Sequence, residues 1–171
     1  KAVSDFSDEL FDLANDMIEA MRGADGIGLA AQQIGQALRF CVIEVPDHPD
    51  YPMTCILDGK PLSPALLRPM PLANPKIQFL PCDEFYYEEG CLSLPGHFAE
   101  VERPAECHLN YIDYHGKEKK LKASGLLSTC IQHEVDHLNG ILFIDYLSKL
   151  KKDMIIKKLV KRKKEIERIV V

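Results

Sequence analysis

The feature that most constrains the fold is a pair of histidines four residues apart, inside a segment with the pattern of a buried helix. Apolar residues recur at helical spacing over residues 124–138, and Asn139-Gly140 then supplies a usual helix stop. One stripe of this helix combines apolar residues with both histidines: Leu126, Cys130, His133 and His137. The sequence therefore predicts that the two imidazoles lie in line with the core of the protein rather than in water.

The two histidines belong to the motif His-Glu-Val-Asp-His, residues 133–137. Residues four apart share a helix face, so both imidazoles can bind one metal ion. Glu134 is turned by about 100° from His133, which lets its carboxylate reach a water at the metal without being a ligand. The motif predicts a metal site with an adjacent general base.

A catalytic site of this kind takes a third protein ligand and keeps one position open for water. No histidine follows His137, so the third ligand is expected upstream. The candidates are cysteines and histidines: Cys41, Cys55, Cys82, Cys91, Cys107, His48, His97, His108 and His115. Cys91 has the most distinctive context, because Gly90 and Pro95-Gly96 let backbone approach a ligand closely. Spacing alone leaves the choice open.

Hydrophobic periodicity predicts two further helices, an N-terminal one over residues 6–21 and an amphipathic one in the C-terminal tail. The tail helix is expected to dock an apolar stripe on the body: Leu147, Leu150, Met154, Leu159 and Ile166. Strands are expected over 39–45, 76–80, 99–101, 106–114 and 118–123, whereas seven prolines predict a loop over 46–71. Because strands and helices are segregated, the predicted class is α+β, with small antiparallel sheets around a central metal-binding helix.

Length and charge give the wider organisation. The 171 residues fit one domain, 1–171, and no apolar run is long enough for a membrane helix. Residues 149–171 hold ten Lys or Arg and three Asp or Glu, a net charge of +7, whereas the rest of the chain carries −12. The basic C-terminal helix therefore has either a polyanionic partner or a solvated face. Six cysteines without a C-x-x-C pair favour a reducing compartment.

Three segments, in order, resemble the peptide deformylases. They are residues 26–33 (G-I-G-L-A-A-Q-Q), 89–93 (E-G-C-L-S) and 132–137 (Q-H-E-V-D-H). Many zinc peptidases share the third motif, but the three together are specific, and the resemblance covers nearly the whole chain. Gln32 stands where the family commonly has proline.

The resemblance implies a metal-dependent hydrolase that removes the N-formyl group from the initiator methionine of nascent polypeptides and releases formate. Its metal ligands would be Cys91, His133 and His137, and its catalytic groups Glu134, the Gln33 amide and the Leu92 backbone N–H. Its substrate-binding residues would be Ile27, Gly28, Gly90, Leu126, Thr129 and Cys130.

The resemblance also implies a cofactor, a location and partners. One divalent metal ion is expected per chain, Fe²⁺ as the native metal, with Zn²⁺, Ni²⁺ or Co²⁺ in purified protein. The expected location is the cytoplasm. The expected partners are N-formyl-methionyl nascent peptides and, through the basic helix, ribosomal RNA, with neither a membrane nor DNA.

Two other functions remain open on the residues alone. A zinc endopeptidase would use the same histidine motif but would leave the Cys91 segment without a role. A structural zinc held by Cys91, His133 and His137 would need a fourth protein ligand and would leave Glu134 without a role.

Overall fold

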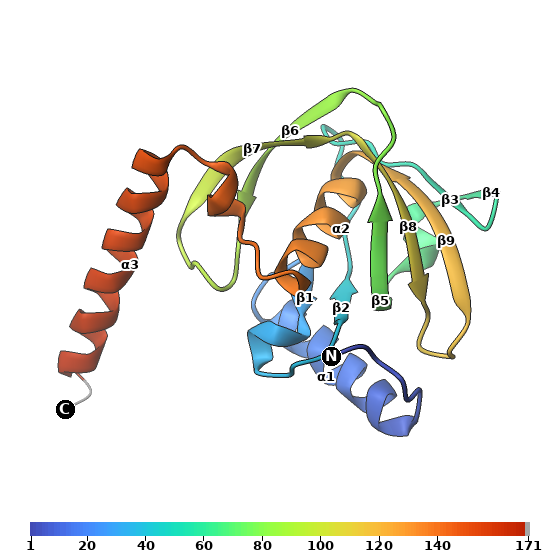
Figure 1. Cartoon of the computed structure of the whole chain (residues 1–171), viewed down its shortest axis with the longest axis horizontal. Helices are drawn as coiled ribbons and strands as arrows, with labels where there is room; N and C mark the ends of the chain where they lie inside the picture. The colour runs from blue at the N-terminus through green and yellow to red at the C-terminus, as the bar shows by residue number, and fades with distance from the viewer. Residues whose placement is uncertain (170–171) are drawn as a thin grey trace.

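The computed structural model describes residues 1–169 and is built around one buried helix, α2 (Gly125–Leu138) (Figure 1). Eleven of its fourteen residues are buried, so the predicted central helix over 124–138 is confirmed. The other helices are α1 (Asp8–Gly23) and α3 (Lys149–Ile169), with short 3₁₀ turns η1 (Ala31–Ile34), η2 (Pro64–Leu67) and η3 (Phe143–Tyr146). No helix among residues 1–169 is long and apolar enough to cross a membrane.

Two antiparallel sheets surround α2, which confirms the α+β class. The larger has seven strands in the order β1-β2-β5-β8-β9-β3-β4, and the smaller pairs β6 with β7. The strands of the larger sheet are β1 (Gly28–Ala30), β2 (Phe40–Ile43), β3 (Cys55–Leu57), β4 (Lys60–Leu62), β5 (Met70–Gln78), β8 (Glu106–Ile112) and β9 (Glu118–Ser124). The smaller sheet consists of β6 (Glu84–Gly90) and β7 (Phe98–Pro104).

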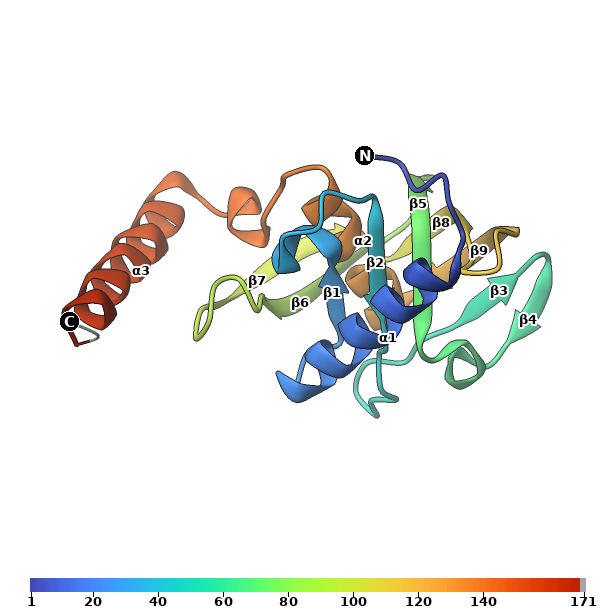
Figure 2. The same ribbon diagram turned by 90° about the horizontal axis from the view of Figure 1, so that it is seen from below.

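Helices α1 and α2 cover opposite faces of the large sheet (Figure 2). Alternate residues of β2 divide between them: Phe40 and Val42 belong to the core cluster of α1, whereas Cys41 and Ile43 belong to that of α2. Successive side chains of a strand point to opposite faces, so a strand buried on both sides is apolar throughout. All four residues of β2 are buried accordingly.

The segment 46–71 is not a continuous loop, and this prediction was wrong. It contains β3, β4, η2 and the start of β5. Two of the prolines fit because of where they lie: Pro61 is in β4, at the edge of the sheet, and Pro64 is the first residue of η2. Proline lacks a backbone donor and is tolerated in edge strands and in the first turn of a helix.

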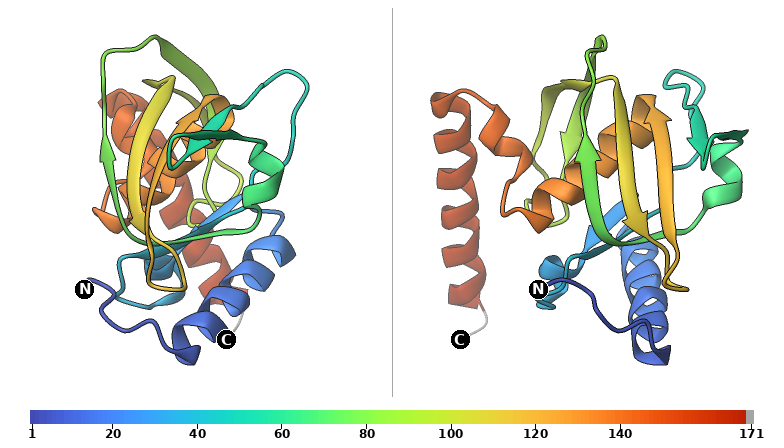
Figure 3. Two further views of the ribbon diagram at one scale, coloured as in Figure 1. Left: turned by 90° about the vertical axis from the view of Figure 1, so that its right-hand side faces the viewer. Right: turned by 45° about the vertical axis from the view of Figure 1, so that its right-hand side comes forward.

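Helix α3 docks only part of the apolar stripe predicted for the tail. Most of the helix stands away from the body (Figure 3). Leu147, which precedes the helix, and Leu159 pack on a core cluster, as does Ile155, which was not predicted. Leu150 and Met154 are half-exposed or more. The reason is angular: Leu150 and Leu159 are nine residues apart, which at 3.6 residues per turn puts them on opposite sides of the helix, about 180° apart.

We expect Gly125→Ala to destabilise the protein by about 2–5 kcal/mol. Gly125 has φ +62°, and a Cβ there would overlap the carbonyl oxygen of Pro52. Gly140→Ala is the matched control, because Gly140 has φ +77° and no heavy atom within 4 Å of such a Cβ. Strain alone should cost the control about 1–2 kcal/mol. Urea unfolding at equal metal loading measures both, and equal losses would contradict the overlap with Pro52.

Candidate active site

A cleft of about 520 Å³ lies between β1, β6, the segment 91–98 and the first three turns of α2. Eleven residues predicted from the sequence line it: Ile27, Gly28, Gln33, Gly90, Cys91, Leu92, Leu126, Thr129, Cys130, His133 and Glu134. His137 is not a lining residue; it is buried and contacts the sulfur of Cys91. The structure thus brings all twelve predicted site residues into one region, from three segments distant in sequence.

Three of these residues form a cluster that could hold a metal ion. The ligand atoms of Cys91, His133 and His137 all lie within 4.8 Å of one another, and Cys91 Sγ is 3.2 Å from His137 Nε2. The histidines come from one face of α2, whereas Cys91 directly follows β6. No second cluster of this kind occurs in the described part of the chain.

The chemistry of the donors fits a divalent transition metal. Burial alone would raise the pKa of the Cys91 thiol, but hydrogen bonds from His133 and His137 outweigh it and lower the pKa to about 5. A thiolate with two imidazoles is a donor set that zinc and iron accept. The cluster offers three protein ligands rather than four, which is the pattern of a site with an open position.

The orientation of His133 is fixed by a carboxylate, that of Glu89, which the sequence did not predict as part of the site. His133 Nδ1 donates to Glu89 Oε2 at 2.8 Å, which leaves Nε2 as the nitrogen available to a metal. In the sequence, Glu89 is only the first residue of the segment 89–93, and no role was predicted for it. Burial would raise the pKa of Glu89, but the contacts with His133 and Arg103 prevail and lower it, so the carboxylate is ionised.

Arg103 holds Glu89 in place from the neighbouring strand β7. Its Nε contacts Glu89 Oε1 and its Nη2 donates to Glu89 Oε2 at 3.0 Å, so the pair is bidentate. Both side chains are only 3% exposed. Removing either partner would leave an unpaired buried charge, which is strongly destabilising. No sequence pattern marked Arg103, since its partners lie 14 and 33 residues away.

Glu134 is a closely confined carboxylate in the cleft. It is 3% exposed, and its Oε2 has no hydrogen-bond partner among the described residues. A Cβ on Gly28 would overlap Glu134 Oε1, so only glycine leaves room for this side chain. Burial raises the pKa of Glu134 to about 7. A carboxylate with a pKa near neutrality, next to a metal-type cluster, is suited to accept and return a proton.

Gln33 projects from η1 towards the cluster. Its Oε1 accepts from the backbone N–H of Ala30 at 2.8 Å, and its Nε2 donates to Ser93 Oγ at 3.0 Å and lies 3.7 Å from Cys91 Sγ. These contacts fix the amide with its donor side facing the Cys91 segment. Leu92 follows Cys91 and is partly exposed at the rim of the cleft.

Apolar side chains line part of the cleft. Ile27, Leu126 and Cys130 belong to or pack on one core cluster, and Cys130 Sγ contacts the carbonyl oxygen of Ile27 at 3.4 Å. Thr129 also lines the cleft. On the β6 side, a Cβ on Gly90 would come within 2.5 Å of the ring of Phe98. Tyr87 and Phe98 also line the cleft and were not predicted. His97, a candidate third ligand, lines the cleft but is not part of the cluster of Cys91, His133 and His137.

Comparison with known proteins gives one consistent result. The family described as Polypeptide deformylase matches residues 1–153. The peptide deformylase of Pelagibacter ubique (strain HTCC1062) is 50% identical over 163 residues, covering 95% of this chain and 86% of that protein. That of Brucella suis biovar 1 is 46% identical over 161 residues, covering 94% and 83%.

Solved structures agree with the sequence matches. The crystal structure of peptide deformylase from Ehrlichia chaffeensis has a TM-score of 0.79 and 37% identity, covering 95% of this chain and 88% of that one. A peptide deformylase from Synechococcus elongatus in complex with actinonin has a TM-score of 0.76 and 39% identity, covering 92% and 76%. Because the likeness extends over nearly the whole sequence and fold, the chain belongs to the polypeptide deformylase family.

Proposed function

We propose that the cleft removes the N-formyl group from the initiator methionine of nascent polypeptides, with one divalent metal ion held by Cys91, His133 and His137. The reaction hydrolyses one amide bond: the formyl C–N bond breaks, water supplies the oxygen of formate, and the amine gains a proton. The observation that carries the proposal is the convergence of three ligand atoms within 4.8 Å, beside the buried carboxylate of Glu134.

The metal, when bound, supplies Lewis-acid polarisation and an acidified water. Glu134 takes the proton from the attacking water at its carboxylate and passes it to the departing amine. Its buried position against Gly28 and its raised pKa suit this role, because a base with a pKa near the working pH can both accept and release a proton.

Attack on the formyl carbon places negative charge on the formyl oxygen. The Gln33 side-chain amide and the Leu92 backbone N–H are the donors proposed for this oxygen. The contacts of Gln33 with Ala30 and Ser93 support the role, since donors fixed in advance need no reorganisation during reaction.

The substrate's methionine side chain would enter the apolar part of the cleft, against Ile27, Leu126, Thr129 and Cys130. The peptide backbone would run between Gly28 of β1 and Gly90 of β6. Strand β1 is at the edge of the large sheet, and within residues 1–169 β6 pairs with β7 alone. An extended peptide can therefore form strand-like hydrogen bonds with their free edges.

The native metal proposed is Fe²⁺, with Zn²⁺, Ni²⁺ or Co²⁺ able to replace it in purified protein. The proposed location is the cytoplasm, where nascent chains and reduced thiols are both present. Anaerobic metal analysis of the protein purified from its own source tests the choice of iron.

Ribosomal RNA is the partner proposed for α3. Lys157, Lys158 and Lys164 are exposed on this helix, and its i,i+4 ion pairs at Lys161 and Lys163 are solvent-exposed and 3.9 Å long. Such pairs are weak, so these lysines are free to exchange Glu165 and Glu167 for phosphates.

We expect Glu134→Gln to reduce formate release from an N-formyl-methionyl peptide by about 10²- to 10⁴-fold, because the amide cannot accept the proton. Metal content should stay at the parental value. In the comparison variant Cys91→Ser, metal content and activity should fall together, since a hydroxyl is a poorer ligand than a thiolate. A Glu134→Gln variant with parental turnover would rule out the proton-transfer role.

We expect Gly28→Ala to lower formate release by about 10²-fold, because the new methyl group displaces the Glu134 carboxylate and a shift of about 1 Å can cost this much. Metal binding should persist. Gly23→Ala is the control, since no heavy atom lies within 4 Å of a Cβ at Gly23. Equal activity of the two variants would show that Glu134 has room to move.

We expect charge reversal at Lys161, Lys163 and Lys164 to reduce co-sedimentation with ribosomes at low salt, because it removes attraction to phosphate groups. Hydrolysis of a free formyl-dipeptide should stay unchanged. Co-sedimentation should also fall as salt rises in the parent protein. If the variant sediments with ribosomes as the parent does, the basic helix face is only solvated.

A further inference from the structure

We propose that Tyr146 is a positioning residue for the metal site, which acts through Arg103 and Glu89 on the orientation of His133. The inference rests on the metal site proposed above. Tyr146 is the last residue of η3, between α2 and α3, and it lines no part of the cleft. It therefore has no contact with substrate, and its effect has to pass through other side chains.

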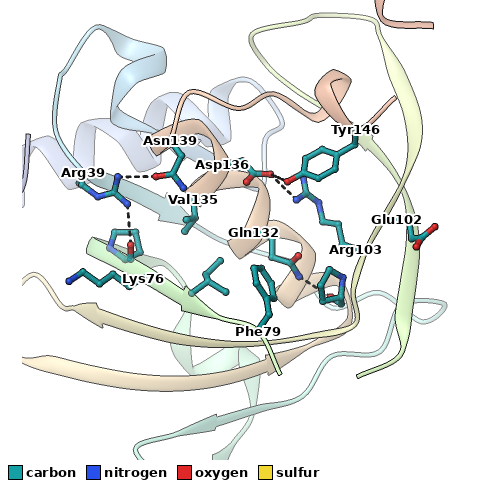
Figure 4. Close-up of a pocket in the computed structure, with 13 residues that line it drawn as sticks. Arg39, Lys76, Phe79, Glu102, Arg103, Gln132, Val135, Asp136, Asn139 and Tyr146 are labelled. Atoms are coloured by element: carbon teal, nitrogen blue, oxygen red, sulfur yellow. Dashed lines mark hydrogen bonds and ion pairs between the residues drawn. The ribbon is translucent and has the colours of Figure 1, made fainter. Parts of the chain in front are cut away.

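The first step is the contact between Tyr146 and Arg103. The Tyr146 hydroxyl donates to Asp136 Oδ2 at 2.9 Å, and Arg103 Nη1 donates to the same oxygen at 2.8 Å (Figure 4). The Cζ atom of Arg103 also lies 4.6 Å from the centre of the Tyr146 ring. Tyr146 thus holds the Arg103 guanidinium in two ways. Its ring contacts the face of the guanidinium, and its hydroxyl fixes the Asp136 carboxylate that binds one edge of it.

The second step runs from Arg103 to the metal ligand. The other edge of the guanidinium binds both oxygens of Glu89, and Glu89 Oε2 accepts from His133 Nδ1 at 2.8 Å. A guanidinium is rigid and planar, so a rotation at the Asp136 edge moves the Glu89 edge as well. Movement of Glu89 would turn the imidazole of His133 away from Cys91 and His137.

The surroundings of Tyr146 separate this role from a structural one. Tyr146 is 49% exposed at a second cavity of about 480 Å³, which shares no lining residue with the cleft. Figure 4 shows Tyr146, Arg103, Asp136 and Gln132 around this cavity. Loss of a hydroxyl from a half-exposed side chain leaves no cavity in the core and has little effect on its stability. A change in metal affinity would therefore report the path to His133.

Tyr86 provides a matched control on β6. It is 51% exposed, and its hydroxyl donates to the carboxylate Oε2 of Glu102 at 2.9 Å, with Glu84 3.2 Å away. Tyr86→Phe thus removes a hydroxyl–carboxylate bond of the same length from a side chain of the same exposure. The difference is that, among the described residues, Glu102 forms no hydrogen bond or ion pair with the side chains of Arg103, Glu89 or His133.

The experiment measures the dissociation constant for Co²⁺ by competition with a chelator, using the full chain stripped of metal. Tyr146→Phe keeps the ring and should raise the dissociation constant about 3- to 10-fold. Tyr146→Leu removes ring and hydroxyl and should raise it about 10- to 100-fold, the range known for partners of ligating histidines. Tyr86→Phe should leave it unchanged. The absorption spectrum of the bound Co²⁺ should shift in the two Tyr146 variants but not in Tyr86→Phe. The reason is that a reoriented His133 changes the ligand field at the ion.

Thermal unfolding of the metal-free proteins completes the test. Tyr146→Phe and Tyr86→Phe should unfold within a few degrees of each other, so that a difference in affinity cannot come from stability. Parental affinity and spectrum in Tyr146→Phe and Tyr146→Leu would overturn the positioning role. A parent protein that binds no Co²⁺ would instead remove the metal site itself, and the inference with it.

Discussion

The buried ion pair between Glu89 and Arg103 is the interaction on which the candidate site depends. The two residues belong to β6 and β7, the small sheet, and each also reaches α2, Glu89 through His133 and Arg103 through Asp136. Because Cys91 follows β6 directly, the pair also fixes where the cysteine meets the two histidines of the helix. A buried pair of this kind returns little net stability after desolvation. Its contribution is to fix the position of the small sheet against α2. Cys91, at the end of β6, is thereby held next to His133 and His137 of the helix.

A second constraint on the site comes from strand β1. The backbone of β1 lies so close to Glu134 that the strand needs glycine at residue 28, and the carboxylate is thereby confined without a hydrogen-bond partner at Oε2 among residues 1–169. The ion pair holds His133 through a hydrogen bond from Nδ1 to Glu89, whereas Gly28 confines Glu134 because the space around the carboxylate is small. Both depend on α2 being buried between the sheets, where a side chain that moves meets another atom rather than water.

The sequence predicted the elements in which apolar residues recur at regular spacing. In residues 124–138 they recur at helical spacing, and the structure has the expected helix, with its apolar stripe and the two histidines. Strand β6 was missed because its exposed face consists of Glu and Tyr, which gives no clean apolar alternation. Arg103 was missed because an ion pair between strands leaves no periodic trace. The predicted apolar stripe of α3 was incorrect in part because its residues were chosen without regard to their angle around the helix axis. Gly90 and Cys91 were assigned to the site by the resemblance to a family rather than by a physical argument.

The two free strand edges at the cleft have a consequence for the breadth of substrates. Strands β1 and β6 offer backbone groups, and backbone N–H and C=O groups are the same in every polypeptide. In the proposed binding mode, one side chain enters an apolar pocket and the following residues bind through their main chain, so almost any protein sequence would be accepted behind the first residue. One such enzyme would then serve an entire proteome, with its selectivity concentrated at the chain end that every newly made protein has in common.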